Sequence, residues 1–430
     1  MGARSGNNYL STLKKLGAEV WFDGVRVPNV TSHEILASRA RTIASLYDLQ
    51  MEKPEAMTFR TDDGGRAGMS FIQPRSADEV RKRGRMMKIW ADYNCGMLRD
   101  TPDVTNVTVA AMSATRELLA ESDRRYRENI ESYYREACKH DWCICFALQG
   151  PDVLGVSPQA SSSGQWLKII EQTSEGIVVG GPCYARSLLP LCEELLVLPG
   201  MGARDPGIAP YVSMFAISSN TKGLKLLVKN SPPNAMDLDC AVLFEDVLVP
   251  WQRVFSFRVR EENRNTPGTP AVSASIVHQT AVRNLASGEF AVGLGVLVAE
   301  AANLISDDAV RAEVVDMTTT VEMMRAQVQR AEAEAVADRW GIFAPNPDAF
   351  DQVITQASRL ESQLVDIVRR ANPSAAARIA AAGEAGGGGY REIAMDVARN
   401  STSNSADGSA YPASLKPIIE RAREFIARRG

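Results

Sequence analysis

The chain has 430 residues, 45% of them hydrophobic and 23% charged, which is typical of a soluble globular protein with more than one domain. Its 48 basic and 52 acidic residues give a net charge of −4, so no basic excess is present to neutralise phosphates, which argues against nucleic acid as the main partner. The N-terminus has no apolar signal segment, and no run of about 18 apolar residues is free of charge. We therefore expect a cytoplasmic protein without a membrane-spanning segment.

The first third of the chain is predicted to be helical. Long stretches at 75–97 and 108–138 mix apolar and charged residues, and the first of them is preceded by Pro74 and opened by Ser76. Between them, residues 96–106 form a turn-rich break. A loop between two helices is a common position for side chains that face a ligand.

The middle third changes to short β-type runs punctuated by glycine and proline, which predicts an antiparallel barrel or sandwich. No strand–helix alternation accompanies them, so a doubly wound nucleotide-binding fold is not expected. Gly200 and Gly202 do not form a dinucleotide fingerprint, because Asp205 and Pro206 follow them. Cys143 and Cys145 alternate as buried strand residues do, and the spacing of cysteines and histidines predicts no metal site.

From about residue 273 the sequence is helical again. Apolar residues from Val310 to Ala335 recur in steps of three and four, as in the core seam of a bundle helix that begins after Ser306. A further helix is predicted at 348–371, a glycine-rich break at 386–389 and a short basic helix at 412–428.

The resulting order is an N-terminal helical domain at 1–141, a central β domain at 142–270 and a C-terminal helical bundle at 271–430. This α+β arrangement, with a central antiparallel β-barrel or sandwich, resembles that of the acyl-CoA dehydrogenase-like flavoproteins.

Four motifs, in order along residues 7 to 300, carry a closer resemblance. They are Tyr9-Leu10 with the segments 24–27 and 44–50, the segment 96–106, the twelve residues 244–255 around Asp-Val-Leu-Val-Pro-Trp, and His278-Gln279. Together they resemble the oxygenase components of the 4-hydroxyphenylacetate 3-hydroxylase family.

The resemblance implies a two-component, FADH2-dependent monooxygenase. A separate flavin reductase would supply reduced FAD, by free diffusion, and O2 would be the co-substrate. A C4a-hydroperoxyflavin would then hydroxylate an electron-rich aromatic substrate, so the cofactor carries the chemistry. The resemblance also implies a homodimer or homotetramer assembled through the helical bundle.

The family motif Gly-Arg-Thr/Ser-Pro-Asp-Tyr assigns the substrate side of the site. Aligned on the Thr-Pro-Asp at 101–103, the family arginine falls on Asp100 and the tyrosine on Val104. The family histidine that faces substrate and flavin falls on Phe146. We predict substrate binding by Asp100, Thr101, Val104 and Phe146, and a catalytic role for Arg99, which is shifted by one position from the family arginine.

The cofactor side follows from two further segments. The backbone at Phe146, Ala147 and Leu148 is predicted to approach the flavin, and Ser187 keeps the hydroxyl of the family's flavin-contacting threonine. His278 is a predicted catalytic residue that faces the cofactor. The loop 200–207 stands where related enzymes close over substrate.

The altered site is compatible with more than one substrate and reaction. An acid at position 100 predicts a neutral or cationic aromatic substrate, or a larger natural product of secondary metabolism. The same flavin could serve N-oxidation or an oxidative rearrangement, and a degenerate, non-catalytic homologue is a third reading. A [4Fe–4S] dehydratase of this fold is excluded, because Arg99 and Leu285 occupy cysteine positions of its cluster.

Overall fold

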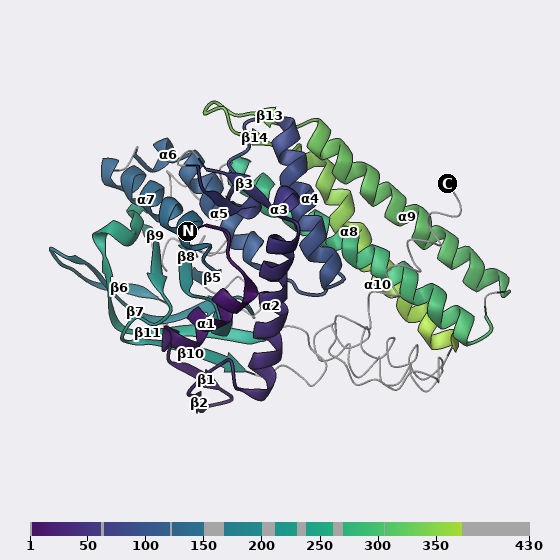
Figure 1. Cartoon of the computed structure of the whole chain (residues 1–430), viewed down its shortest axis with the longest axis horizontal. Helices are drawn as coiled ribbons and strands as arrows, with labels where there is room; N and C mark the ends of the chain where they lie inside the picture. The colour runs from purple at the N-terminus through teal and green to yellow at the C-terminus, as the bar shows by residue number, and fades with distance from the viewer. Residues whose placement is uncertain are drawn as a thin grey trace.

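The computed structural model of the chain describes residues 2–61, 64–120, 123–149, 167–199, 211–229, 238–260, 270–304 and 306–371. Figure 1 shows helices of the N-terminal third lying between a sheet, built mainly from the middle third, and three long C-terminal helices. The predicted segments at 200–207, 386–389 and 412–428 lie outside the described residues.

Local capping signals start the N-terminal helices. Ser5, His33 and Ser76 each accept a hydrogen bond from a backbone N–H in the turn that follows. The described helices of this part are α1 (Gly6–Leu16), α2 (Glu34–Glu52), α3 (Pro54–Met57), α4 (Ala77–Tyr93), α5 (Pro102–Ala114), α6 (Glu117–Ala120) and α7 (Arg124–His140).

Two helix boundaries differ from the prediction. α5 begins at Pro102, inside the segment expected to be a turn, because proline at the first helical position has its φ already fixed near the helical value. The stretch 108–138 is not one helix: α5 ends at Ala114, and α7 starts after Asp123, whose side chain accepts from the Arg125 N–H.

The central sheet is mostly antiparallel, with strand order β12-β9-β8-β5-β7-β11-β10-β1-β2, and β6 pairs with β7 beside this path. Two neighbouring pairs, β5 with β8 and β1 with β10, are parallel. β1 and β2 join the sheet from the N-terminal part of the chain, so strand pairing crosses the predicted boundary at 141. The strands are β1 (Val20–Phe22), β2 (Val25–Val27), β5 (Ile144–Gln149), β6 (Lys168–Gln172), β7 (Gly176–Ala185), β8 (Glu194–Pro199), β9 (Tyr211–Ser218), β10 (Leu224–Lys229), β11 (Asp239–Pro250) and β12 (Val254–Arg260), with small separate pairs β3 (Thr58–Arg60) with β4 (Arg66–Gly68) and β13 (Val336–Ala337) with β14 (Phe343–Ala344).

The C-terminal helices are α8 (Pro270–Ala301), α9 (Asp308–Ala333) and α10 (Phe350–Ala371). The seam predicted for α9 is confirmed, since its apolar positions from Val310 to Ala331 are buried. The cap is Asp307 and not Ser306: its carboxylate accepts hydrogen bonds of 3.0 Å from the Ala309 and Val310 N–H groups.

Within α8, Val272–Ala299 has the length and hydropathy of a membrane-spanning helix. However, 94% of its most apolar window is buried inside the protein, where α8 packs against α4, α5, α9 and α10. The burial identifies it as a core helix of the bundle.

The seven cysteines are free and buried, as predicted for core thiols. Among the described residues, no group of three His, Cys, Asp or Glu side chains is arranged to hold a metal ion.

A buried ion pair attaches the N-terminus to the sheet. The Arg4 guanidinium lies 2.5 Å from the carboxylate of Glu193, just before β8, and packs over the Tyr47 ring at 4.7 Å. The Arg4 backbone N–H and the Gln50 side chain both donate to Asp141 at the end of α7. The N-terminal segment, α2 and the end of α7 are thereby tied to the start of β8, an interior strand of the sheet.

Removing one partner of this ion pair should strongly lower the free energy of unfolding. We expect Glu193→Ala to lower the free energy of unfolding by about 3–5 kcal/mol, because Arg4 stays buried without its counter-charge. Glu55→Ala at the exposed Arg66–Glu55 pair should cost less than about 1 kcal/mol. Urea unfolding followed by circular dichroism measures both, and equal losses in the two variants would contradict the assigned role.

Candidate active site

The loop between α4 and α5 is pressed against α8. Cys95 and Gly96 both have left-handed backbones, with φ of 59° and 66°. A Cβ at Gly96 would lie 2.5 Å from the Arg283 carbonyl oxygen on α8, so only glycine fits at this approach. The loop that carries the predicted substrate residues is therefore held by backbone contact with the bundle.

Asp100 joins this loop to the end of β7. Its carboxylate accepts hydrogen bonds from the Ser187 N–H at 3.0 Å and the Ser187 hydroxyl at 2.8 Å. The Arg186 guanidinium lies 3.3 Å from the other carboxylate oxygen. The Asp100 side chain is only 7% exposed, whereas that of Arg186 is 38% exposed. A predicted substrate residue and a predicted cofactor residue thus contact each other directly.

Thr101 and Val104 lie at the start of α5. The Thr101 hydroxyl donates to the carboxylate of Asp103, and the Gln279 amide of α8 lies 3.4 Å from both side chains. Burial raises the pKa of Asp103 to about 6. Val104 is buried among the core residues. Asp103 was not singled out from the sequence, although its place in the Thr-Pro-Asp motif fits a helix start.

The predicted flavin-facing segment lies in β5. Ala147 pairs with Ala185 of β7 and Val197 of β8, so β5 is covered by strands on both sides at this point. The Phe146 carbonyl accepts a hydrogen bond of 3.2 Å from the Arg186 N–H. Phe146 and Ser187 are therefore close to one another and to Asp100.

The two predicted catalytic residues lie in different parts of the structure. The His278 ring faces the interior of the bundle, with Nε2 2.9 Å from the Glu332 carboxylate and the ring stacked on Phe350 at 5.5 Å. Desolvation lowers the pKa of His278. Arg99 is an exposed residue of the α4–α5 loop, next to Asp100 in the sequence. The catalytic roles of both residues stay predictions.

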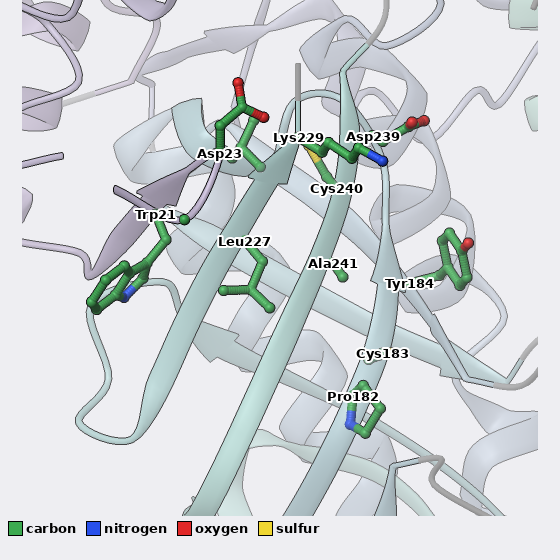
Figure 2. A pocket seen from close by; sticks show the side chains of 12 residues that line it. Trp21, Asp23, Pro182, Cys183, Tyr184, Leu227, Lys229, Asp239, Cys240 and Ala241 are labelled. Carbon is green, nitrogen blue, oxygen red and sulfur yellow. The ribbon is translucent and has the colours of Figure 1, made fainter. Parts of the chain in front are cut away.

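A pocket of about 710 Å³ opens on the exposed face of the sheet (Figure 2). Its floor is a lateral row of paired residues: Trp21 opposite Leu227, Leu227 opposite Ala241, and Ala241 opposite Tyr184. Leu148 of β5 is paired with Tyr184 and continues the same row. Residues paired across strands point to the same side of a sheet. The apolar row therefore ends at a residue predicted to contact the flavin.

Comparison with known proteins identifies relatives over almost the whole described chain. Sequence profiles described as the N-terminal and C-terminal parts of 4-hydroxyphenylacetate 3-hydroxylase match residues 5–256 and 270–380. The 4-hydroxyphenylacetate 3-monooxygenase oxygenase component of Thermus thermophilus is 30% identical over 86% of this chain and 79% of its own length. The corresponding protein of Geobacillus is 31% identical over 86% and 78%. An FADH2-dependent monooxygenase of Burkholderia cepacia is 25% identical over 81% and 70%.

Solved structures agree with these relatives. The crystal structure of a 4-hydroxyphenylacetate 3-monooxygenase oxygenase component superimposes with a TM-score of 0.78 at 27% identity, covering 99% of both chains. Its complex with FAD gives a TM-score of 0.78 at 26% identity, again with 99% of both chains covered. A 4-hydroxybutyryl-CoA dehydratase has a TM-score of 0.73 at 13% identity over 99% of this chain and 94% of its own, which shows a shared fold only. The predicted acyl-CoA dehydrogenase-like α+β fold is confirmed.

The raised pKa of Asp103 makes the contact between α5 and α8 depend on pH. Because the folded-state pKa is about 6 against an ordinary 3.8, folding favours the protonated acid. The contribution of this group to the free energy of unfolding is fully present below a pH of about 4 and is lost as the pH rises through 6. The total loss is about 3 kcal/mol.

Asn at position 103 cannot ionise. Between pH 4 and pH 7 the free energy of unfolding of Asp103→Asn should therefore rise by about 3 kcal/mol relative to that of the wild type. Urea unfolding at a series of pH values measures the difference. Asp308→Asn, at a side chain 89% exposed, provides a control whose difference from the wild type should stay flat. A flat profile for Asp103→Asn as well would exclude the buried acid as the cause.

Proposed function

The chain belongs to the 4-hydroxyphenylacetate 3-hydroxylase family and is a flavin-dependent monooxygenase that uses reduced FAD and O2, and we propose that it is the oxygenase component that hydroxylates an aromatic substrate in a pocket altered from that of the phenol hydroxylases. A separate flavin reductase supplies the FADH2. The observation that carries the proposal is the meeting of Asp100, Ser187 and Phe146 where the α4–α5 loop, β7 and β5 come together.

Reduced FAD, when bound, supplies the electrons and the activated oxygen of the reaction. The chain's own part is then to bind, orient and exclude water. The pocket of about 710 Å³ has an apolar floor between the rings of Trp21 and Tyr184, which suits a planar ring system. Phe146 and Leu148 would hold the flavin ring from β5.

Ser187 would offer the cofactor a hydrogen-bond acceptor and not a donor. Its single hydroxyl proton is donated to Asp100, so towards a ligand its oxygen can act only as an acceptor. It would therefore accept a hydrogen bond from an N–H group of the reduced flavin ring. Asp100 would fix the direction of the Ser187 hydroxyl without contacting the cofactor itself.

The pairing of Asp100 changes the expectation about substrate charge. An unpaired acid in place of the family arginine would favour a cationic substrate, but Arg186 lies 3.3 Å from Asp100 and compensates its charge. The altered site therefore does not select for a cation through Asp100. A neutral or anionic aromatic compound, including a natural-product intermediate, fits the pair better.

We also propose a homodimer or homotetramer in the cytoplasm, assembled through the helical bundle. The outward face of α9 exposes Val315 at 39% and Met323 at 51%, which are eight positions and thus about 80° apart around the helix, within one broad face. Met323→Glu should weaken self-association, measured by light scattering after size exclusion. An unchanged mass would place the interface elsewhere.

Activity should depend on reduced FAD delivered from outside. With photoreduced FAD and oxygenated buffer, we expect the purified chain to form a hydroxylated product from 4-hydroxyphenylacetate or another phenol, identified by mass spectrometry. Heavy-isotope O2 should place one labelled oxygen in the product. Binding of reduced FAD under anaerobic conditions is the separate control.

Failure to bind reduced FAD would refute the oxygenase and favour a degenerate homologue. Binding without oxygen insertion into any phenol, but with insertion at a nitrogen, would favour N-oxidation.

A further inference from the structure

The loop between α4 and α5 lies along one face of α8. A Cβ at Gly96 would lie 2.5 Å from the Arg283 carbonyl oxygen and 2.6 Å from the Ser287 nitrogen. One turn earlier on α8, the amide nitrogen of Gln279 lies 3.4 Å from the Thr101 hydroxyl. Gln279, Arg283 and Ser287 follow one another at intervals of four residues, so they share one face of the helix. The same stripe of α8 therefore holds the loop near its start and at its end.

Asp100 lies between these two contacts with α8. On one side, the Leu98 N–H donates to the side chain of Asn94 at 3.1 Å, which ties the start of the loop to the end of α4. On the other side, Thr101 directly follows Asp100 in the sequence. The position of the Asp100 carboxylate, and with it the direction of the Ser187 hydroxyl, therefore depends on both contacts.

The Thr101 hydroxyl contacts a distant segment instead of forming a local helix cap. A threonine before the first residue of a helix commonly accepts a hydrogen bond from a backbone N–H of the first turn. Here the hydroxyl donates to one oxygen of the Asp103 carboxylate, and the Gln279 nitrogen lies 3.4 Å from the other oxygen. Thr101, Asp103 and Gln279 are only 4%, 1% and 4% exposed. A local cap would form without α8, whereas this buried network requires it.

We propose that Gln279 is a positioning residue of the site: through Thr101 and Asp103 it holds the α4–α5 loop where the Asp100 carboxylate meets Ser187. This inference rests on the proposed function, because Ser187 is there the residue that contacts the flavin. Gln279 acts through the loop and is assigned no contact of its own with cofactor or substrate.

The chemistry of the amide suits this position. The NH2 group of Gln279 has two donors, one for the Thr101 oxygen and one for the Asp103 carboxylate, and it brings no further charge into the interior. Methionine has a similar length and no donor. Because the Asp103 carboxylate is buried, loss of a donor leaves one of its oxygens unsatisfied, which costs more than the loss of an exposed hydrogen bond.

The test is hydrogen exchange of the full-length protein without flavin, resolved to the Ser187 N–H by mass spectrometry. That N–H donates to Asp100 at 3.0 Å, so its exchange reports on the contact between the loop and the end of β7. Gln279→Met should accelerate the exchange about 5-fold relative to the slow amides of the sheet, the range of one hydrogen bond. Thr101→Val should act similarly, and the double variant should fall short of the product of the two effects, because both remove the same contact.

Two control variants separate positioning from a general loss of stability. Val107→Ala removes buried volume from α5 itself and should accelerate the slow amides alike, without a selective change at Ser187. Gln327→Met makes the same substitution at an exposed Gln327–Gln352 contact between α9 and α10 and should leave the exchange of Ser187 unchanged.

Anaerobic titration with reduced FAD connects the loop to the cofactor. Gln279→Met should bind reduced FAD about 5-fold more weakly than the wild type. In a Ser187→Ala background the same substitution should change the affinity less than about 2-fold, because the contact through which Gln279 acts is already absent.

The other outcomes separate this inference from the proposed function. Exchange at Ser187 that is unchanged, or raised only as much as in Val107→Ala, would overturn the proposal, as would equal losses of affinity with and without the Ser187 hydroxyl. If Gln279→Met does not fold, Thr101→Val decides by the same measurement. Selective acceleration at Ser187 in a protein that does not bind reduced FAD would support the role of Gln279 in holding the loop and refute the proposed function.

Discussion

The contact between Asp100 and Ser187 is the interaction on which the geometry of the site depends. It joins the α4–α5 loop to the end of β7 through two hydrogen bonds to one carboxylate. The same loop is fixed from the other side, where Gly96 contacts the backbone of α8. A carboxylate removed from water gains little from one ion pair alone, and its desolvation is offset here by hydrogen bonds together with Arg186. The loop therefore holds the end of β7 and the backbone of α8 in a fixed arrangement, which is what a catalytic site requires of its surroundings.

Regular patterns in the sequence predicted the elements well. The steps of three and four in α9 describe a helix whose seam is buried, and the short apolar runs of the middle third form the sheet. Both signals are local, because burial on one face of a helix or strand repeats within a few residues. Helix starts are harder to predict: the Thr-Pro-Asp motif lies in a segment predicted to be a turn, and the structure starts α5 at its proline, a residue that is also favoured at the first helical position.

The site could be predicted only in part, because its contacts join distant segments. Ser187 was expected to face the flavin and Asp100 the substrate, but the bond between them spans 87 residues and follows no local pattern. His278 and Gln279 are neighbours on α8, yet successive helix residues point roughly 100° apart. Gln279 accordingly reaches the loop at Thr101, while His278 turns to Glu332 in the bundle.

The contact between Asp100 and Arg186 explains why the charge of the candidate site could not be predicted by comparing motifs one at a time. At position 100 an acid stands in place of the family's base, which by itself indicates a reversed preference for substrate charge. The fold brings the guanidinium of Arg186, the first residue after β7, to 3.3 Å from the Asp100 carboxylate. The acid of the loop and the cation after β7 are thus adjacent in space, although they are far apart in the sequence. The charge that a ligand would meet here follows from that pair and not from either residue alone, since discrimination depends both on what is attracted and on what is left unpaired.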